Sequence, residues 1–306
     1  MLLCRGADAK AKGSDKWTPL HAATLNGFTE AVLLLLTRGA DNGDRNSAGQ
    51  APLHIAAWGG HDAVICRRLN RGPNIEAKAF ANQTPLHKAA WGGHDVTVVL
   101  LLDGGADAEA KGPAIRTPLY MAARGGHDAT VGLLLDQEAD IEAKDPANLA
   151  LLHKASLDGC KATIRLLLDR RANAEAKDSE EQAPPHKASW CGHRAAIGLL
   201  LDRGANIGAK DWCKQTKLHI FALNGSEATV QLLLVRGAEI EAKDSNKLTS
   251  LHKAAWGGYG AVIGLLLDQE ADIWAKDSEC QTLLHIATRR GYEVAARLLN
   301  RESEGL

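Results

Sequence analysis

Histidine is the residue in this chain best suited to chemistry, because its imidazole binds metal ions and transfers protons near neutral pH. The sequence contains 12 histidines. Eight of them recur at one constant interval, which is interrupted only where Tyr120 stands in place of histidine: His21, His54, His87, His153, His186, His219, His252 and His285. The other four each follow a glycine: His61, His94, His127 and His193.

This spacing argues against a metal centre. If each interval corresponds to one structural unit, equivalent histidines lie about one helix diameter apart, roughly 10 Å. Zinc requires all its ligands at about 2 Å from one point. We therefore predict that the first eight histidines connect neighbouring units by hydrogen bonds, and that the chain has no metal site and no cofactor.

Other catalytic patterns are also missing. The sequence contains no HExxH, G-x-S-x-G, P-loop or G-x-G-x-x-G pattern. One alternative set of residues combines a phenol, a cation and an acid in the middle of the chain: Tyr120, Met121, Arg124, Asp158 and Trp190. These side chains suit a pocket for a small molecule, but no reaction follows from them. We predict a protein that is not an enzyme and has no catalytic residues, with this pocket as the alternative.

The histidine spacing reflects an internal repeat of the whole chain. Tetrapeptides like Thr84-Pro85-Leu86-His87 begin at residues 18, 51, 84, 117, 150, 183, 216, 249 and 282, with no insertion between them. Thr is a good N-cap and Pro is tolerated in the first helical turn, so each tetrapeptide predicts a helix start. A glycine then recurs nine residues after each start, which predicts a left-handed residue closing a short first helix. A leucine-rich second helix follows, and then a Gly-Ala-Asp turn.

This pattern resembles the ankyrin repeat, and the resemblance covers nearly the whole chain. It implies an all-α fold, an ankyrin-repeat solenoid of stacked helix-turn-helix units with projecting β-hairpin-like loops. Residues 1–306 are expected to form a single array. It would consist of a partial repeat at 1–12 and full repeats beginning near residues 13, 46, 79, 112, 145, 178, 211, 244 and 277.

Several units depart from the repeat. Glu138, Arg171 and Glu270 replace the glycine that ends the second helix, where we expect a left-handed residue. Gly132, Gly198 and Gly264 lie inside second helices, where glycine is worse than alanine by roughly 1 kcal/mol. Segment 183–221, with two consecutive prolines and a lysine in place of the repeated proline, is predicted to be the weakest part of the array.

The two ends also differ. In the partial repeat, Leu2-Leu3 end a second helix and Gly6-Ala7-Asp8 form its turn, without the helix pair that should precede them. We expect end-to-end self-association through this uncapped repeat, and a chain derived from a longer array.

Composition excludes several classes of protein. The formal net charge is −1, which argues against a nucleic-acid binder. No apolar run approaches the length of a membrane span, and no signal peptide is recognisable. The six cysteines have no C-x-x-C spacing and are typical of free thiols in a reducing compartment. We predict a cytoplasmic protein with no membrane or nucleic-acid partner.

Equivalent positions form rows along a solenoid. A basic residue begins every loop: Lys12, Arg45, Lys78, Lys111, Lys144, Lys177, Lys210, Lys243 and Lys276. Two residues earlier, five repeats carry Glu76, Glu109, Glu142, Glu175 or Glu241. This loop row is interpreted as a solvated surface, with a ridge that binds polyanions as the alternative.

The candidate partner-binding residues lie at the end of each first helix, which the resemblance places on the concave side. Four tryptophans recur in that row, and lysines precede three of them by three residues, as in Lys88 and Trp91. Trp and Arg are enriched in binding hot spots. The predicted binding residues are Trp58, Lys88, Trp91, Arg124, Lys154, Leu157, Lys187, Trp190, Leu223, Lys253, Trp256 and Arg289.

Two interpretations of this row remain open: the tryptophans bind a partner, or they brace neighbouring helices. We predict a scaffold or adaptor that holds an unidentified protein partner in the concave groove and on the loop row.

Overall fold

The computed structural model describes residues 8–304, and it describes side chains through residue 300. Within this part the chain is all-helical, with eighteen α-helices in consecutive pairs and no strand beyond an isolated bridge between Lys276 and Thr282. The predicted all-α fold is confirmed. Leu2, Leu3, Gly6 and Ala7 of the predicted partial repeat lie outside the described residues.

The chain divides into two compact units, residues 1–146 and 147–306. Unit 1 contains the helices α1 (Pro19–Leu25), α2 (Thr29–Thr37), α3 (Pro52–Gly59), α4 (Asp62–Leu69), α5 (Pro85–Gly92), α6 (Asp95–Asp103), α7 (Pro118–Gly125) and α8 (Asp128–Asp136). Short 3-10 turns η2 (Ser14–Lys16), η3 (Phe80–Asn82) and η4 (Pro113–Ile115) lie in its loops.

Unit 2 continues the alternation of a first and a second helix. Its helices are α9 (Leu151–Asp158), α10 (Lys161–Asp169), α11 (Pro184–Trp190), α12 (Arg194–Asp202), α13 (Lys217–Asn224), α14 (Glu227–Val235), α15 (Ser250–Gly257), α16 (Gly260–Leu267), α17 (Leu283–Arg289) and α18 (Glu293–Glu304).

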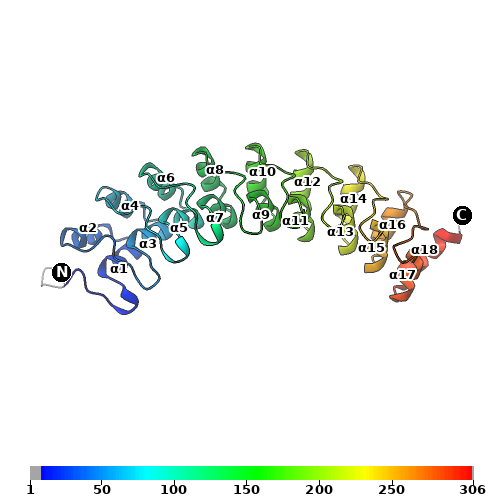
Figure 1. Cartoon of the computed structure of the whole chain (residues 1–306), viewed down its shortest axis with the longest axis horizontal. Helices are drawn as coiled ribbons and strands as arrows, with labels where there is room; N and C mark the ends of the chain where they lie inside the picture. The colour runs from blue at the N-terminus through cyan, green and yellow to red at the C-terminus, as the bar shows by residue number, and fades with distance from the viewer. Residues whose placement is uncertain (1–7, 305–306) are drawn as a thin grey trace. The chain divides into compact units, whose positions relative to one another are not determined.

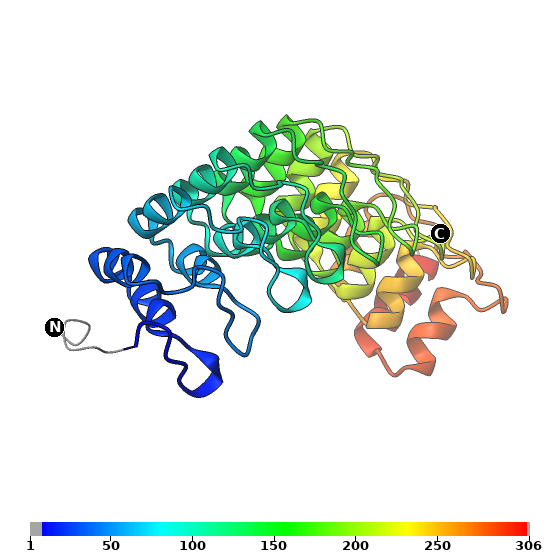
Figure 2. The ribbon, with the colours of Figure 1, turned by 60° about the vertical axis from the view of Figure 1, so that its left-hand side comes forward.

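Each unit has two layers of helices. In unit 1 the first helices α1, α3, α5 and α7 contact one another in succession, and α2, α4, α6 and α8 form the second layer (Figure 1). In unit 2, α9, α11, α13, α15 and α17 form the first layer in the same way. Figure 2 gives a second view of both layers. The buried residues of these helices are mainly leucines, such as Leu86 and Leu101, and small alanines, such as Ala89 and Ala90. The alanines allow the helices to pack closely.

The first helices begin where the tetrapeptides predict. At Thr18, Thr117 and Thr249 the hydroxyl oxygen accepts a hydrogen bond from the backbone N–H three residues later. In most repeats the histidine of the tetrapeptide accepts a second bond through Nδ1 from the backbone N–H of the N-cap residue, as His54 does from Ala51 at 3.2 Å. Histidine therefore takes the role that Glu or Gln has in a capping box.

The same histidines connect successive repeats. Because Nδ1 accepts from a backbone N–H, the proton must lie on Nε2, which then donates to a carbonyl of the next repeat. His54 Nε2 donates to Gln83 O at 3.0 Å. His21, His87, His153 and His219 make the equivalent bond, each at 3.0 Å. His186 Nε2 instead donates to Ala209 O, at the end of its own repeat, at 3.0 Å. The predicted histidine ladder is confirmed for His54 and these four residues, whereas Nε2 of His252 is buried without a hydrogen-bond partner.

The remaining four histidines connect the second layer to the first. His61, His94, His127 and His193 donate through Nε2 to the carbonyls of Leu25, Trp58, Trp91 and Leu157 in the preceding repeat, at 2.8–3.0 Å. The ring lies directly over the repeated glycine. Gly93 has φ +66°, and a Cβ there would stand 2.3 Å from Nδ1 of His127. The glycine is therefore required by its backbone conformation and by the ring above it.

The predicted departures from the repeat are accommodated locally. Glu138, Arg171 and Glu270 adopt left-handed φ values of 59°, 66° and 60°, as expected for residues in the place of glycine.

Segment 183–221 contains no interruption of its helices. Pro184 and Pro185 are buried in the first turn of α11, where their missing N–H groups are not needed. Lys217 is buried at the start of α13, and its Nζ donates to Asn206 O at 2.7 Å. Burial lowers the pKa of this lysine to about 8. The division between the two units lies before this segment.

A pair of glycine substitutions tests the glycine constraint. We expect Gly93→Ala to lower the free energy of unfolding by about 2 kcal/mol or more, because alanine opposes the positive φ and collides with His127. Gly132→Ala is the control: its Cβ would meet nothing within 4 Å inside α8, so stability should rise by about 1 kcal/mol. Urea unfolding measures the free energy of unfolding of both variants. Equal effects of the two substitutions would contradict the conclusion that position 93 requires glycine.

The ladder also predicts acid sensitivity. Burial lowers the pKa of His54 to about 4 and of His186 to about 3, and it lowers the pKa values of His21, His87, His153, His219 and His252 as well. In the unfolded chain the histidine pKa values are near 6.5. Between the folded and the unfolded pKa of each histidine, the unfolded chain therefore binds more protons than the folded chain. The contribution of the neutral histidines to the free energy of unfolding is complete above pH 6.5, and it decreases as the pH falls toward 4.

The measurement is the free energy of unfolding at pH 7.5, 6.0 and 4.5. We expect a loss of several kcal/mol over this range, above the pH at which most carboxylates titrate. His54→Gln should be less stable at pH 7.5 but should show a smaller pH dependence. A stability that stays constant from pH 7.5 to 4.5 would contradict a neutral ladder.

Candidate partner-binding surface

The residues at the ends of the first helices, together with those one helical turn earlier, are called the first-helix surface. Its tryptophans are accessible: Trp58, Trp91, Trp190 and Trp256 are 53%, 38%, 45% and 39% exposed. Arg124 and Arg289 are exposed, whereas Lys88, Lys154, Leu157, Lys187 and Leu223 are half-buried and Lys253 is buried. The row therefore presents large aromatic rings to solvent in both units.

Arginines lie over two of these rings. The guanidinium carbon of Arg124 is 5.2 Å from the centre of the Trp91 ring, and that of Arg290 is 4.7 Å from the centre of the Trp256 ring. Both arginines come from the following repeat, so each pair fixes a tryptophan against the next first helix by a cation–π contact. Arg290 was not predicted from the sequence, because it lies one residue after the row position occupied by Arg289.

The lysines of unit 2 are already paired with acids of the chain. Lys187 Nζ lies 2.6 Å from Asp178 Oδ2, and Lys253 Nζ lies 2.8 Å from Asp244 Oδ2. Lys154 Nζ lies 2.6 Å from Asp158. The ammonium groups of these lysines are therefore engaged within the chain and are not available in full to carboxylates of a partner.

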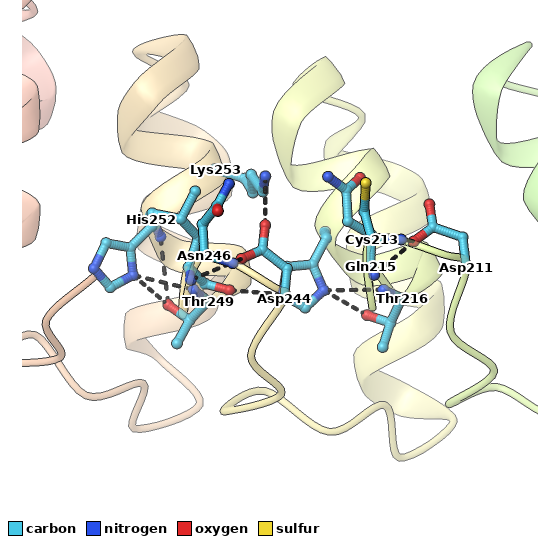
Figure 3. Close-up of polar contacts among 11 residues, drawn as sticks. Asp211, Cys213, Gln215, Thr216, Asp244, Asn246, Thr249, His252 and Lys253 are labelled. Atoms are coloured by element: carbon cyan, nitrogen blue, oxygen red, sulfur yellow. Dashed lines mark hydrogen bonds and ion pairs between the residues drawn. The ribbon is translucent and has the colours of Figure 1, made fainter. Parts of the chain in front are cut away.

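The acids of these pairs begin a loop turn. Oδ1 of Asp244 accepts hydrogen bonds from the N–H groups of Asn246 and Leu248 at 2.8 and 2.9 Å, while Oδ2 meets Lys253 (Figure 3). Burial raises the pKa of this carboxyl, but the hydrogen bonds from Lys253 and Leu248 outweigh burial and hold the pKa below its ordinary value. The same balance lowers the pKa of Asp178 beside Lys187. These aspartates were not singled out in the sequence, although their recurrence at the repeat interval was a visible signal.

Asp211 occupies the same position between these two pairs. Its Oδ1 accepts from the N–H groups of Cys213 and Gln215 at 2.9 and 2.8 Å. Ile220 stands where the neighbouring repeats have lysine, so this carboxylate lacks a cation in its own repeat. Burial raises the pKa of Asp211 above its ordinary value.

A surface cavity of about 620 Å³ lies at the C-terminal end of unit 2. Trp256, Asp277, Ile286, Arg289, Arg290 and Tyr292 line it, together with Glu279 and Gln281. Two members of the predicted binding set, Trp256 and Arg289, therefore share one concavity with acids and an additional aromatic ring.

The residues of the alternative pocket belong to different units. In unit 1, Tyr120 and Met121 are buried, the Tyr120 hydroxyl lies 3.5 Å from Asp145, and Arg116 lies over its ring. In unit 2, Asp158 is paired with Lys154. The phenol and the acid thus have partners within their own units.

The loop rows connect neighbouring repeats. Lys177 Nζ donates to Lys210 O at 3.2 Å, and Arg45 donates to Lys78 O. Glu76 and Glu175 accept from the N–H groups of Asp107 and Asn206 in the following loops, at 2.9 and 2.8 Å. Arg45, Lys177, Glu76 and Glu175 therefore stabilise the loops by bonds between neighbouring repeats.

No group of three or more His, Cys, Asp or Glu side chains is placed to hold a metal ion in residues 8–300. None of the helices in the described part of the chain combines the length and apolarity needed to span a membrane.

Comparison with known proteins agrees with this architecture. The family model "Ankyrin repeats (3 copies)" matches residues 1–79, 65–145 and 218–305. The chain therefore belongs to the ankyrin repeat family, whose repeats are generally protein-interaction modules and whose members are typically not enzymes.

Among solved structures, the chain is similar to the ankyrin repeat domain of Bcl-3, "a unique member of the IkappaB protein family". The sequence identity is 29%, the TM-score is 0.61, and the match covers 68% of this chain and 95% of that one. A comparison with curated proteins gives no match.

A matched pair of lysine substitutions tests the geometry of this surface. Lys253→Met should lower the free energy of unfolding by about 3 kcal/mol, because it leaves the Asp244 carboxylate buried without its cation. Lys88→Met is the control, since Lys88 forms no ion pair in the described part of the chain and burial already lowers its pKa. It should leave stability unchanged or slightly raised, and similar losses in both variants would contradict the pairing.

Proposed function

We propose that this protein is an interaction scaffold or adaptor that holds a partner protein on the first-helix surface and the adjoining loops. The observation that carries the proposal is the row of exposed tryptophans, Trp58, Trp91, Trp190 and Trp256. Exposure of large aromatic side chains to water is unfavourable, and such side chains are typical of binding hot spots. Membership of the ankyrin repeat family supports the same class of function.

The alternative role of these tryptophans is to brace adjacent helices. The backbone already connects successive repeats at these positions, because the carbonyls of Trp58 and Trp91 accept hydrogen bonds from histidines of the next repeat. The rings themselves keep about two fifths or more of their surface exposed. The Trp91 and Trp256 rings also contact an arginine of the next repeat, whereas in the described part of the chain the exposed Trp58 and Trp190 rings make no cation–π contact. Exposed rings without such a contact favour binding over bracing.

Finer features of the proposal follow from the sequence pattern. We propose that residues 1–306 form a single ankyrin array, which consists of a partial repeat at 1–12 followed by nine full repeats. Self-association through the N-terminal repeat belongs to the same proposal. The cysteines described are all free thiols, which favours a cytoplasmic location.

The test begins with isolation of a partner, using the full chain as bait in an extract of the native source. The affinity and the melting temperature are then measured for Trp58→Ala, Trp91→Ala, Trp190→Ala and Trp256→Ala. We expect at least one substitution to weaken binding by about 2 kcal/mol or more, with little change in melting temperature.

Val235→Ala is the control, because Val235 is exposed at the end of a second helix, away from the first-helix surface. It should change neither quantity. Unchanged affinity in all four folded tryptophan variants would remove the first-helix surface from the function and leave the loops as the binding site.

A further inference from the structure

Three successive repeats of unit 2 provide a comparison within one chain. Asp178, Asp211 and Asp244 begin the same loop turn, and Oδ1 of each accepts two backbone N–H groups. In the outer two repeats a lysine nine residues later places Nζ 2.6–2.8 Å from Oδ2. The repeats therefore contain a specific position for an ammonium group beside this carboxylate.

At Asp211 that position has no cation. Ile220 replaces the lysine, and among residues 8–300 no ion pair and no hydrogen bond reaches Oδ2. Lys253 in the next repeat is already held by Asp244 (Figure 3). Within residues 8–300 the adjacent Lys210 and Lys214 form no ion pair with Asp211. Asp211 is 6% exposed, and the Lys253 charge acts on it without forming an ion pair, so water and Lys253 compensate the carboxylate only in part.

Exposed apolar side chains lie on the residues and helices next to Asp211. Helix α13, which follows Asp211, packs between α11 and α15, and these helices carry the exposed Trp190 and Trp256. Leu223 is half-buried at the end of α13, and Trp212, next to Asp211, is exposed. An apolar row therefore lies on both sides of the position that lacks its cation.

We propose that Asp211 accepts a lysine or arginine side chain of the partner protein, from a segment whose apolar residues contact Trp190 and Trp256. The inference rests on the proposed function, since it names the chemistry of the partner on the same surface. The partner's cation takes the place that Lys187 and Lys253 take in the neighbouring repeats. A basic and apolar segment, rather than an acidic one, is the occupant that this surface complements.

Asp277 also has an isoleucine, Ile286, in the lysine position, but it is not part of the proposal. Arg289 and Arg290 line the same cavity and supply positive charge there. Ile286 lines this cavity beside Trp256, so a substitution there would change the binding surface itself.

The probe is a phage-displayed library of random dodecapeptides, selected on the immobilised full chain. The best peptide is synthesised, and its Kd is measured by fluorescence anisotropy for each variant. Ile220→Lys supplies the lysine of the neighbouring repeats, and Asp211→Asn removes the charge while its amide oxygen still accepts the two N–H groups. Each should weaken binding by about tenfold or more.

Val235→Lys is the control, because it adds the same charge at an exposed position of a second helix, away from the first-helix surface. It should leave the Kd within about twofold of the unmodified chain. Melting curves separate binding from folding, and Ile220→Lys should melt no lower than the unmodified chain because it restores an ion pair present in two other repeats. The enriched peptides should contain Lys or Arg beside apolar residues.

Two results would overturn the inference: enriched peptides without Lys or Arg, or an unchanged Kd in both Asp211→Asn and Ile220→Lys. If Trp190→Ala and Trp256→Ala weaken the same peptide while the Asp211 variants do not, the proposed function stands and only the inference fails. If none of these variants changes the Kd, the first-helix surface itself is not the binding site.

Discussion

The neutral imidazole of the repeated histidine is the group on which the rest of the structure depends. Its Nδ1 accepts the N–H at the start of its own first helix, and its Nε2–H donates to a carbonyl of the next repeat, as in His54 between Ala51 and Gln83. One buried side chain therefore caps a helix and fixes the distance to its neighbour. A protonated ring would lose the first bond and place a charge in an apolar interior.

This constraint explains why the chain has so many histidines. Eight belong to the repeated tetrapeptide, and the other four bind carbonyls over the repeated glycines, as His127 does above Gly93. It also explains why all the repeats have the same length, since an insertion between Ala51 and Gln83 would displace the carbonyl that His54 must reach. Variation is confined to side chains that leave these bonds intact, and those side chains form the surface on which we place the function.

Much of the fold was predictable from the sequence, because helix starts, helix ends and inter-repeat bonds are each specified by a residue at a fixed position. The left-handed backbone at Glu138 follows from the glycine found there in other repeats. The candidate binding row was also visible, because equivalent residues align when helices stack. The ion pair of Asp244 with Lys253 was not predicted, since a loop must fold back on the helix before residues nine apart meet. The burial of Lys217 was missed because a lysine is ordinarily exposed, and here a backbone carbonyl of the preceding loop receives its ammonium group.

The binding surface and the histidine ladder are thus separate parts of each repeat. The ladder uses backbone groups and buried rings, whereas Trp190, Leu223 and Trp256 extend from helices that the ladder has already positioned. A repeat can therefore exchange one surface residue for another, as Ile220 replaces the lysine of its neighbours, without loss of its connection to the next repeat.

The most direct test of this account is the tautomer and protonation state of the ladder histidines, measured by NMR on the ¹⁵N-histidine-labelled chain. Long-range ¹H–¹⁵N correlations distinguish the Nε2–H tautomer, the Nδ1–H tautomer and the imidazolium ion. The account predicts that His54 and His186 are Nε2–H tautomers and remain neutral at pH 5 in the folded chain. Rings that carry the proton on Nδ1, or that titrate near pH 6.5 as in an unfolded peptide, would contradict it.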